Sequence, residues 1–521
     1  MEKRYLPIGT QDFRKLRERN NIYVDKTERI HSLCKAGRMY FLARPRRFGK
    51  SLLLSTMSEL FKGSKNLFEG LWIADHWDWT VTNPVIHISF ASVDYEEKGL
   101  VFGIRKMLLE LYAEFDAAPP HDHSIKGLFT TLIKQIHAKQ GKVVILIDEY
   151  DKPIIDYMET HELDRAKANQ VILGNFYGGL KDADPFIRML FITGVSKFTK
   201  VSLFSKLNNL DDLTINPHYS TLLGYTQQEL EYYFVDYIDD ALPLFPEYNR
   251  QQFLEKVRVW YNGYSWDGVN RLYNPFGTLL FLESREFQSH WFQSGTPTFL
   301  VKMLLKQDFF HLENIETTIN FLNQYSLDNL ELTSLLFQTG YLTIKEKSKE
   351  GYLVLSYPNQ EVREATYEFI ITDMGHPRGG GGMTIQHLQK AFMSNDLEKA
   401  EDILTALFGG LPFDVYTHQT VRQIEGFYHG LVHILFQCLG LHMQSEVHTS
   451  KGRADCIVQT PTHIYILEFK LDSNAQHALT QIENKRYAKP FAADPRIKVG
   501  IGINFNSLTK ELDGWETQVL T

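Results

Sequence analysis

Short apolar runs alternate with segments of helical periodicity in the first part of the chain. A buried parallel strand reads as a brief, nearly continuous apolar run, because helices cover both of its faces. Runs of this kind occupy 39–43, 84–90, 143–147 and 189–193, and helical spacing of apolar residues occupies 100–115 and 166–180. The alternation predicts an α/β domain with a mainly parallel sheet and helices on both faces.

Helical periodicity dominates after this region, as in 227–238 and 251–261. We interpret 223–325 as a helical lid. A helix ending at Thr339-Gly340 is followed by two strand-like runs, 341–344 and 352–355, an order compatible with a winged-helix unit. The four glycines after Arg378 have too much backbone freedom for the interior of an element, so they predict a linker or loop tip.

The C-terminal part returns to a mixed pattern. It predicts a helix over about 421–439, strands at 442–448, 454–459 and 463–470, a helix over 474–489 and a last strand at 498–503. The predicted division of the chain is 1–222, 223–325, 326–414 and 415–521. The first and last segments are α/β, 223–325 is the helical lid, and 326–414 contains the possible winged-helix unit and the linker.

Composition agrees with several globular units. A chain of 521 residues is too long for one ordinary core, and 43% hydrophobic with 13% aromatic residues indicates well-packed domains. Three cysteines without a paired motif are typical of a reducing compartment. With no apolar start and no run of ~18–20 apolar residues, we expect a cytoplasmic protein without a membrane segment. The net charge of −8 means that DNA binding would require local basic patches.

A nucleotide-binding motif follows the first predicted strand. The string from Arg44 to Ser51 ends in the Gly-Lys-Ser of a Walker A loop, although Arg44 stands where the first glycine is expected. Backbone N–H groups and the following helix N-terminus attract phosphate. Lys50 would reach the terminal phosphates and Ser51 would bind Mg²⁺.

A second strand carries the matching carboxylates. The run 143–147 ends in Asp148, which would complete the Mg²⁺ shell, and Glu149, which would orient or deprotonate the attacking water. Thr193 either touches the γ-phosphate or caps a loop. The predicted nucleotide-binding residues are Arg44, Pro45, Arg46, Arg47, Phe48, Gly49, Lys50, Ser51, Asp148 and Thr193. Two alternatives stay open: Arg44 marks a nucleotide binder with weak or absent hydrolysis, and Arg46 and Arg47 are solvated turn residues.

The C-terminal segment holds a second cluster of charged residues. Asp455 precedes an apolar run that ends in Glu468-Phe469-Lys470. Side chains two apart on a strand share a face, so Glu468 and Lys470 point the same way, and a returning antiparallel strand would bring Asp455 beside them. The two carboxylates would bind Mg²⁺ or Mn²⁺, and Lys470 would position the nucleophile or stabilise developing charge.

Other residues would complete this site. Glu425, on the preceding helix, would add a metal ligand or align a water, and Gln481 on the following helix would reach the same cleft. The predicted catalytic residues are Glu149, Asp455, Glu468, Lys470, Glu425 and Gln481. The competing interpretation of Glu468 and Lys470 is a surface ion pair on a solvated edge strand.

The chain resembles bacterial proteins that pair an AAA-ATPase-like N-terminal domain with a C-terminal PD-(D/E)XK nuclease-superfamily domain. The strings that carry the resemblance are 8–13, 23–27, 44–51, 148–153, 261–264, 452–455 and 468–470. The resemblance implies an AAA-like P-loop fold followed by a restriction-endonuclease-like fold. It also implies that Arg44 is expected in this family and that Asp455, Glu468 and Lys470 cleave phosphodiesters with a metal ion.

The preferred hypothesis is therefore an ATP-binding, hydrolysing protein whose ATPase state controls a Mg²⁺-dependent nuclease acting on DNA. One alternative is a nucleotide-controlled switch whose nuclease-like domain recognises nucleic acid or protein without cleaving it. Another is an ATPase that acts on protein partners, which the balanced charge after residue 421 permits. A homo-oligomer is compatible with the ATPase domain, because such domains often borrow residues from a neighbouring subunit.

Overall fold

The protein is described by a computed structural model that covers residues 3–121, 124–158, 162–197, 209–290, 312–322, 331–375, 381–409, 442–449, 452–509 and 511–520, with residues 432, 435 and 436. The chain forms two compact units. Unit 1 comprises Met1–Phe299 with Glu313–Val362, and unit 2 comprises Leu300–Leu312 with Arg363–Thr521. The finer division into four segments stays a prediction.

Unit 1 is built on a five-stranded parallel sheet. Its strands are β1 (Met39–Ala43), β2 (Val85–Ser89), β3 (Val143–Asp148), β4 (Ile187–Gly194) and β5 (Leu210–Asp212), in the order β2-β3-β4-β1-β5. The central strands β1 and β3 are buried along their whole length, which explains their apolar runs. The predicted parallel α/β sheet is confirmed. The short polar strand β5 was missed, because Leu-Asp-Asp carries no strand pattern.

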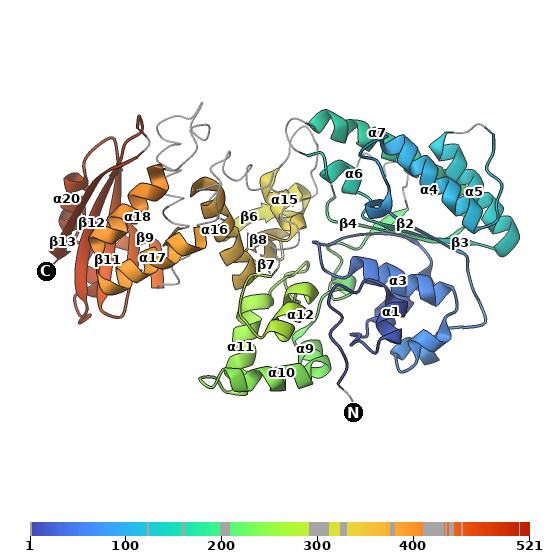
Figure 1. Ribbon diagram of the computed structural model, residues 1–521, viewed down its shortest axis with the longest axis horizontal. Helices are drawn as coiled ribbons and strands as arrows, with labels where there is room; N and C mark the ends of the chain where they lie inside the picture. The colour runs from blue at the N-terminus through green and yellow to red at the C-terminus, as the bar shows by residue number, and fades with distance from the viewer. Residues whose placement is uncertain are drawn as a thin grey trace. The chain divides into compact units, whose positions relative to one another are not determined.

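Helices cover both faces of this sheet (Figure 1). One face carries α1 (Phe13–Glu18) and α3 (Lys50–Phe61), and the other carries α4 (Leu100–Glu114), α5 (Ile125–Gln140) and α7 (Leu163–Ala183). The remaining helices of this region are α2 (Thr27–Ala36) and α6 (Lys152–Ile155). Because every strand runs the same way, the loops that follow β1, β3 and β4 all leave the sheet at one edge.

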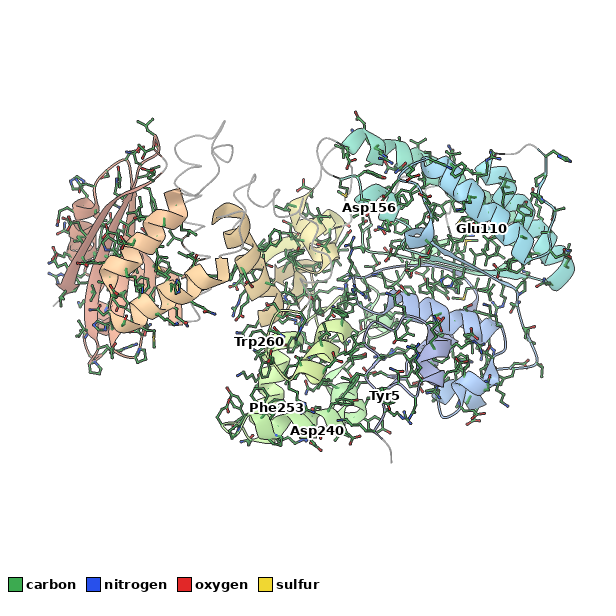
Figure 2. All side chains as sticks on the ribbon, viewed as in Figure 1. Tyr5, Glu110, Asp156, Asp240, Phe253 and Trp260 are labelled. Carbon is green, nitrogen blue, oxygen red and sulfur yellow. The ribbon has the colours of Figure 1, made fainter. Side chains whose placement is uncertain are left out.

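The helical region of unit 1 contains α9 (Gln227–Tyr233), α10 (Val235–Ala241), α11 (Arg250–Tyr261) and α12 (Pro275–Ser284). Phe253 and Trp260 lie on α11, and Phe253 packs in the core of this region with Phe281 of α12 (Figure 2). Asn274 accepts hydrogen bonds from two backbone N–H groups of the first turn of α12. This N-cap fixes where α12 begins, and the first residues of α12 line a cavity.

A three-stranded sheet follows. The predicted hairpin is present as β7 (Thr343–Lys347) and β8 (Tyr352–Ser356), and β6 (Ile315–Thr318) pairs with the other side of β8. The helices α14 (Ile319–Leu322) and α15 (Leu332–Thr339) belong to the same part of unit 1, whereas α16 (Gln360–Gly375) lies in unit 2 from Arg363 on. Gly340 ends α15 with a φ of 93°. The winged-helix interpretation of this unit stays a prediction.

The prediction of a linker or loop tip over the four glycines was wrong for the last two. Gly381 and Gly382 form the start of α17 (Gly381–Ser394), and Arg378 to Gly380 lie outside the described residues. The first turn of a helix needs no intrahelical N–H bonds, so glycine costs less there than in a helix interior.

Unit 2 contains a five-stranded mixed sheet. Its strands are β9 (His442–Thr449), β10 (Gly452–Gln459), β11 (His463–Leu471), β12 (Ile497–Phe505) and β13 (Leu512–Leu520), in the order β13-β12-β11-β10-β9. Only β11 and β12 are parallel. The edge strand β13 was not predicted, because its sequence is largely polar. The predicted helix over 421–439 lies almost entirely outside the described residues.

Helices pack on both faces of this sheet, and the strand alternation decides which side chains meet them. Tyr465 donates a hydrogen bond to the carbonyl of Phe392 on α17, which is followed by α18 (Leu397–Gly409). Ile464 and Ile466 face the opposite way and pack with Leu479 of α20 (Ala475–Lys485). By the same alternation, Glu468 and Lys470 lie on the α20 face.

Glycine lets α20 approach the sheet closely. A Cβ on Gly502 of β12 would lie 2.2 Å from the carbonyl oxygen of Ala475. Gly502 is the register partner of Glu468 on β11. The close approach therefore occurs beside Glu468, where α20 can contribute a side chain.

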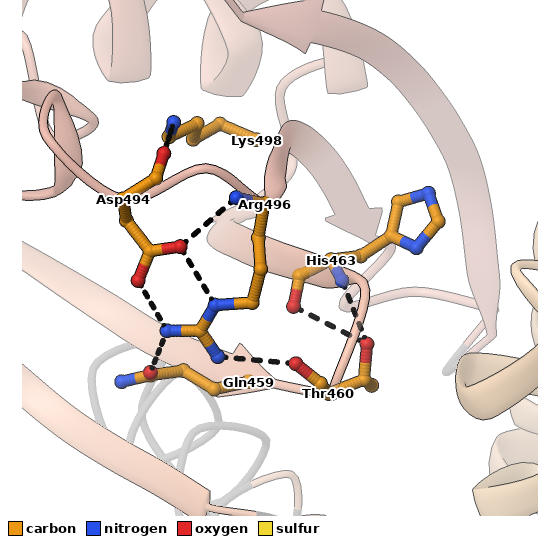
Figure 3. Close-up of polar contacts among 6 residues, drawn as sticks. All are labelled: Gln459, Thr460, His463, Asp494, Arg496 and Lys498. Atoms are coloured by element: carbon orange, nitrogen blue, oxygen red, sulfur yellow. Dashed lines mark hydrogen bonds and ion pairs between the residues drawn. The ribbon is translucent and has the colours of Figure 1, made fainter.

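Arg496 links two segments at the end of this sheet that lies away from Glu468 (Figure 3). Its guanidinium donates to both carboxylate oxygens of Asp494, to Gln459 at 2.8 Å and to the carbonyl of Thr460 at 3.0 Å. The guanidinium holds the pKa of Asp494 well below its usual range. These contacts fasten the β10–β11 turn to the start of β12.

Over the part of the chain that the structure describes, no helix combines the length and apolar character needed to cross a membrane.

Candidate functional sites

The loops after β1 and β3 are both attached to the end of β4, which lies between these strands. The N–H of Arg44 donates to the carbonyl of Gly194 at 3.1 Å, and the N–H of Tyr150 donates to that of Thr193 at 3.1 Å. Both loops are thereby fixed at one edge of the sheet, as the topology of parallel strands requires.

The loop between β1 and α3 adopts two left-handed backbone positions, Arg47 with φ 65° and Gly49 with φ 88°. Lys50 begins α3, and its ammonium donates to the carbonyls of Arg44 and Pro45 at 2.9 Å each. Burial lowers the pKa of Lys50, while the carboxylates of Asp148 and Glu149 oppose that shift. The ammonium has three N–H donors, so these two carbonyls leave one donor for a phosphate.

Two side chains of this loop, Arg44 and Phe48, anchor it to neighbouring segments. Arg44 is 1% exposed and donates to the carbonyl of Thr214 at 2.8 Å, with its guanidinium 4.0 Å from the ring centre of Trp266. Burial lowers the pKa of Arg44 to about 9. Phe48 packs edge-on against Tyr264 and Trp266. The aromatic turn at 260–266 therefore contacts this loop directly.

Asp148 is oriented by the neighbouring strand. The hydroxyl of Thr193 donates to Asp148 Oδ1 at 2.6 Å, and both side chains are buried. Thr193 therefore holds the Asp148 carboxylate in place. Glu149 has a φ of 50°, and burial together with the charge of Asp148 raises its pKa. A carboxyl with a raised pKa is suited to accept a proton near neutral pH.

These elements line a cavity of about 360 Å³. Its phosphate-loop side is lined by Arg46, Arg47, Gly49, Lys50 and Ser51, with Glu149 beside them. Its other lining residues include Gly9, Thr10, Gln11, Tyr225, Pro275, Phe276 and Leu279. The other predicted nucleotide-binding residues, Arg44, Pro45, Phe48, Asp148 and Thr193, are not among its lining residues. The volume is within the range of small-molecule sites, ~300–1,000 Å³.

Several of these residues were missed by sequence reasoning. Gln11, Tyr225 and Phe276 reach the cavity from segments far apart in the chain; Gln11 lies in the string 8–13, but no local pattern gives any of the three a role in the site. Asp151 accepts hydrogen bonds from the N–H and hydroxyl of Ser196 at 2.7 Å each, which fixes the loop after β4. The string Asp148 to Pro153 contained Asp151, but only the fold shows its partner.

In unit 2 the structure brings together four of the predicted residues. The pairing of Cys456 with Leu467 places Asp455 opposite Glu468. Asp455 Oδ2 accepts a hydrogen bond from the N–H of Phe469 at 2.9 Å, and Lys470 Nζ lies 3.2 Å from Glu468 Oε1. Gln481 of α20 donates to the same Glu468 oxygen. Glu425 lies outside the described residues.

The environment of Glu468 differs from that of a surface ion pair. Its side chain is 2% exposed, on the central strand β11. Burial and the charge of Asp455 raise the pKa of Glu468 to about 7, although Lys470 opposes the shift. The interpretation of Glu468 as an edge-strand surface residue is therefore wrong.

A divalent cation fits this pair of carboxylates. Glu468 Oε2 is buried and has no hydrogen-bond partner among the described residues, a state that costs roughly 1–3 kcal/mol. Mg²⁺ and Mn²⁺ prefer carboxylate oxygens and complete their shells with water and phosphate oxygens. Within the described ranges, no group of three or more His, Cys, Asp or Glu side chains is arranged to hold a metal. Among the described residues, Asp455 and Glu468 are the candidate protein ligands.

We expect the apparent Mn²⁺ affinity of unit 2 to decrease about tenfold per pH unit below pH 7, because Glu468 must lose its proton to bind metal. The same raised pKa makes folding stability fall as pH rises from about 4.5 to 7, since the native state holds the proton more tightly than the unfolded state. Mn²⁺ titrations by electron paramagnetic resonance would compare wild-type protein with Glu468→Gln. An affinity difference between them that does not change with pH would contradict this prediction.

The comparisons with known proteins agree with this geometry. A family described as "Predicted AAA-ATPase" matches residues 7–204, and the PD-(D/E)XK nuclease superfamily matches residues 423–515. A protein of Azotobacter chroococcum mcd 1, described as an uncharacterized protein in the vnfD 5'region, is 37% identical over 530 residues, covering 100% of both chains. The chain belongs to this family of predicted AAA-ATPases with a C-terminal PD-(D/E)XK nuclease-superfamily domain.

The folds of both units are those expected for this family. The parallel sheet of unit 1 is that of a P-loop NTPase, and the sheet of unit 2 fits the nuclease superfamily. Among solved structures, the Aeropyrum pernix ORC1 protein in complex with DNA matches with a TM-score of 0.25 and 11% identity, covering 66% of this chain and 91% of that chain. A likeness at that score has no bearing on partners.

Proposed function

We propose that this protein binds and hydrolyses ATP and that its nucleotide state controls a Mg²⁺-dependent nuclease acting on DNA. The observation that supports the nuclease most strongly is the buried Glu468, which faces Asp455 and contacts both Lys470 and Gln481. The convergence of Lys50, Ser51 and Glu149 on one cavity supports ATP hydrolysis. We also propose a cytoplasmic location.

ATP hydrolysis would use residues at the end of the parallel sheet. Lys50 and the N-terminus of α3 would bind the phosphates, and Ser51 and Asp148 would hold Mg²⁺, which neutralises charge on the phosphates. Glu149 would accept the proton of the attacking water. The water oxygen forms a bond to the γ-phosphorus, the bond from that phosphorus to the β–γ bridging oxygen breaks, and ADP leaves with the electron pair.

Phosphodiester cleavage would use the second cluster. Asp455 and Glu468 would hold Mg²⁺ or Mn²⁺, which polarises the scissile phosphate and lowers the pKa of a water. Lys470 would stabilise the negative charge that develops on the phosphate, and Gln481 would keep Glu468 in place. The water oxygen bonds to phosphorus, one phosphodiester P–O bond breaks, and the leaving oxygen takes up a proton.

The test is incubation of the full-length protein with plasmid, single-stranded DNA and RNA, with Mg²⁺ or Mn²⁺, in the presence and absence of ATP. We expect metal-dependent DNA cleavage whose rate changes with ATP and which Glu468→Gln abolishes. Binding without cleavage under every condition would contradict the nuclease and favour the alternative, a nucleotide-controlled switch that recognises nucleic acid or protein.

A further inference from the structure

Arg47 has an unusual backbone conformation in the nucleotide loop. Its φ of 65° lies in the left-handed region, which a non-glycine residue adopts only when its surroundings impose it. The next residue, Phe48, is 1% exposed and packs against Tyr264 and Trp266. Phe48 thus anchors the loop on one side, while Arg47 lines the cavity on the other.

The guanidinium of Arg47 rests on an aromatic ring. It lies 4.7 Å from the ring centre of Phe276, in the first turn of α12. The N-cap Asn274 holds this turn through the N–H of Phe276 at 2.9 Å. Among the described residues, no carboxylate pairs with Arg47. A cation–π contact at an exposed site contributes only ~0.5–1 kcal/mol, so the guanidinium is easily transferred to a stronger partner.

Three other cations near the cavity, Lys50, Lys152 and Arg44, are held differently. Lys50 donates to two backbone carbonyls, Lys152 pairs with Asp156 at 2.7 Å, and Arg44 is buried behind the loop. Arg47 is exposed and lines the cavity together with Lys50 and Glu149. A planar guanidinium bonds phosphate oxygens in a bidentate manner, which a ring cannot match.

We propose that Arg47 moves from the ring of Phe276 onto the terminal phosphate of bound ATP and supplies, from within the same chain, the arginine that stabilises the transition state. This inference rests on the proposed ATP hydrolysis and concerns the transfer written above: as the γ-phosphoryl group passes from ADP to water, Arg47 neutralises charge on its oxygens. The site would then need no arginine from a neighbouring subunit.

The first test compares Arg47→Ala with Arg38→Ala in the full-length protein. Arg38 is exposed and precedes β1, at the opposite end of that strand from the nucleotide loop. We expect Arg47→Ala to lower kcat about 10³-fold. It should also weaken MgATP binding about tenfold without changing MgADP binding, whereas Arg38→Ala stays within about twofold of wild type. An Arg47→Ala protein with wild-type kcat and an unchanged preference for ATP over ADP would overturn the inference.

The second test separates action within one chain from action between chains. Arg47→Ala keeps Glu149, and Glu149→Gln keeps Arg47, so an arginine that acts across a subunit interface would restore hydrolysis when the two variants are mixed. We expect no recovery at any mixing ratio, and recovery would overturn the proposal. If wild-type protein neither binds nor hydrolyses MgATP, the proposed function fails. If wild type turns over ATP and Arg47→Ala matches it, only this inference fails.

Discussion

Replacement of Lys470 by methionine is expected to lower metal-dependent cleavage about 10³-fold while the protein stays folded. The Lys470 ammonium lies 3.2 Å from Glu468 Oε1, and its side chain is 27% exposed, so it sits at the open side of the carboxylate pair. Methionine retains much of the side-chain volume and removes the charge. The loss therefore reports on electrostatic stabilisation of the phosphate, with little effect on packing.

The measurement is the rate of DNA cleavage with Mn²⁺, alongside thermal unfolding of the same samples. Lys485→Met is the matched control, because Lys485 is exposed at the end of α20 and has no part in the site. Wild-type cleavage by Lys470→Met, from a preparation in which Glu468→Gln is inactive, would remove Lys470 from the mechanism. Equal cleavage by all three variants would indicate a contaminating nuclease.

Replacement of Lys50 by methionine is expected to lower ATP turnover by at least about 10²-fold, because the cation that binds the terminal phosphates is lost. The fold should not be weakened to the same degree. Burial lowers the pKa of Lys50, so at neutral pH the charged side chain costs folding free energy, and removing the charge removes that cost. The carbonyls of Arg44 and Pro45 lose a donor in exchange.

Steady-state hydrolysis, MgATP binding and thermal unfolding would be measured together. The control is Lys62→Met, since Lys62 is the exposed C-cap of the same helix α3. We expect Lys62→Met to behave like wild type in all three measurements. Turnover by Lys50→Met at the wild-type rate would show that the loop does not bind phosphate in the proposed way.

Local patterns in the sequence were sufficient for features that depend on neighbours along the chain. The apolar runs predicted β1, β3 and β4, because strands buried on both faces are composed mostly of apolar residues. The two-residue spacing of Glu468 and Lys470 placed them on one face of a strand, and an antiparallel return brought Asp455 opposite Glu468. The polar strands β5 and β13 were missed. Hydrogen bonds to an adjacent strand stabilise them, and their own side chains carry no strand pattern.

The sequence by itself thus determined the fold class and the charged residues of both candidate sites. The tertiary structure decided their partners: Thr193 on Asp148, Trp266 over Arg44, Phe276 under Arg47 and Gln481 on Glu468. The reason is physical, since these partners come from segments whose spacing along the chain has no regular period. Burial, which raises the pKa of Glu468 and lowers that of Lys50, likewise exists only after the chain has packed.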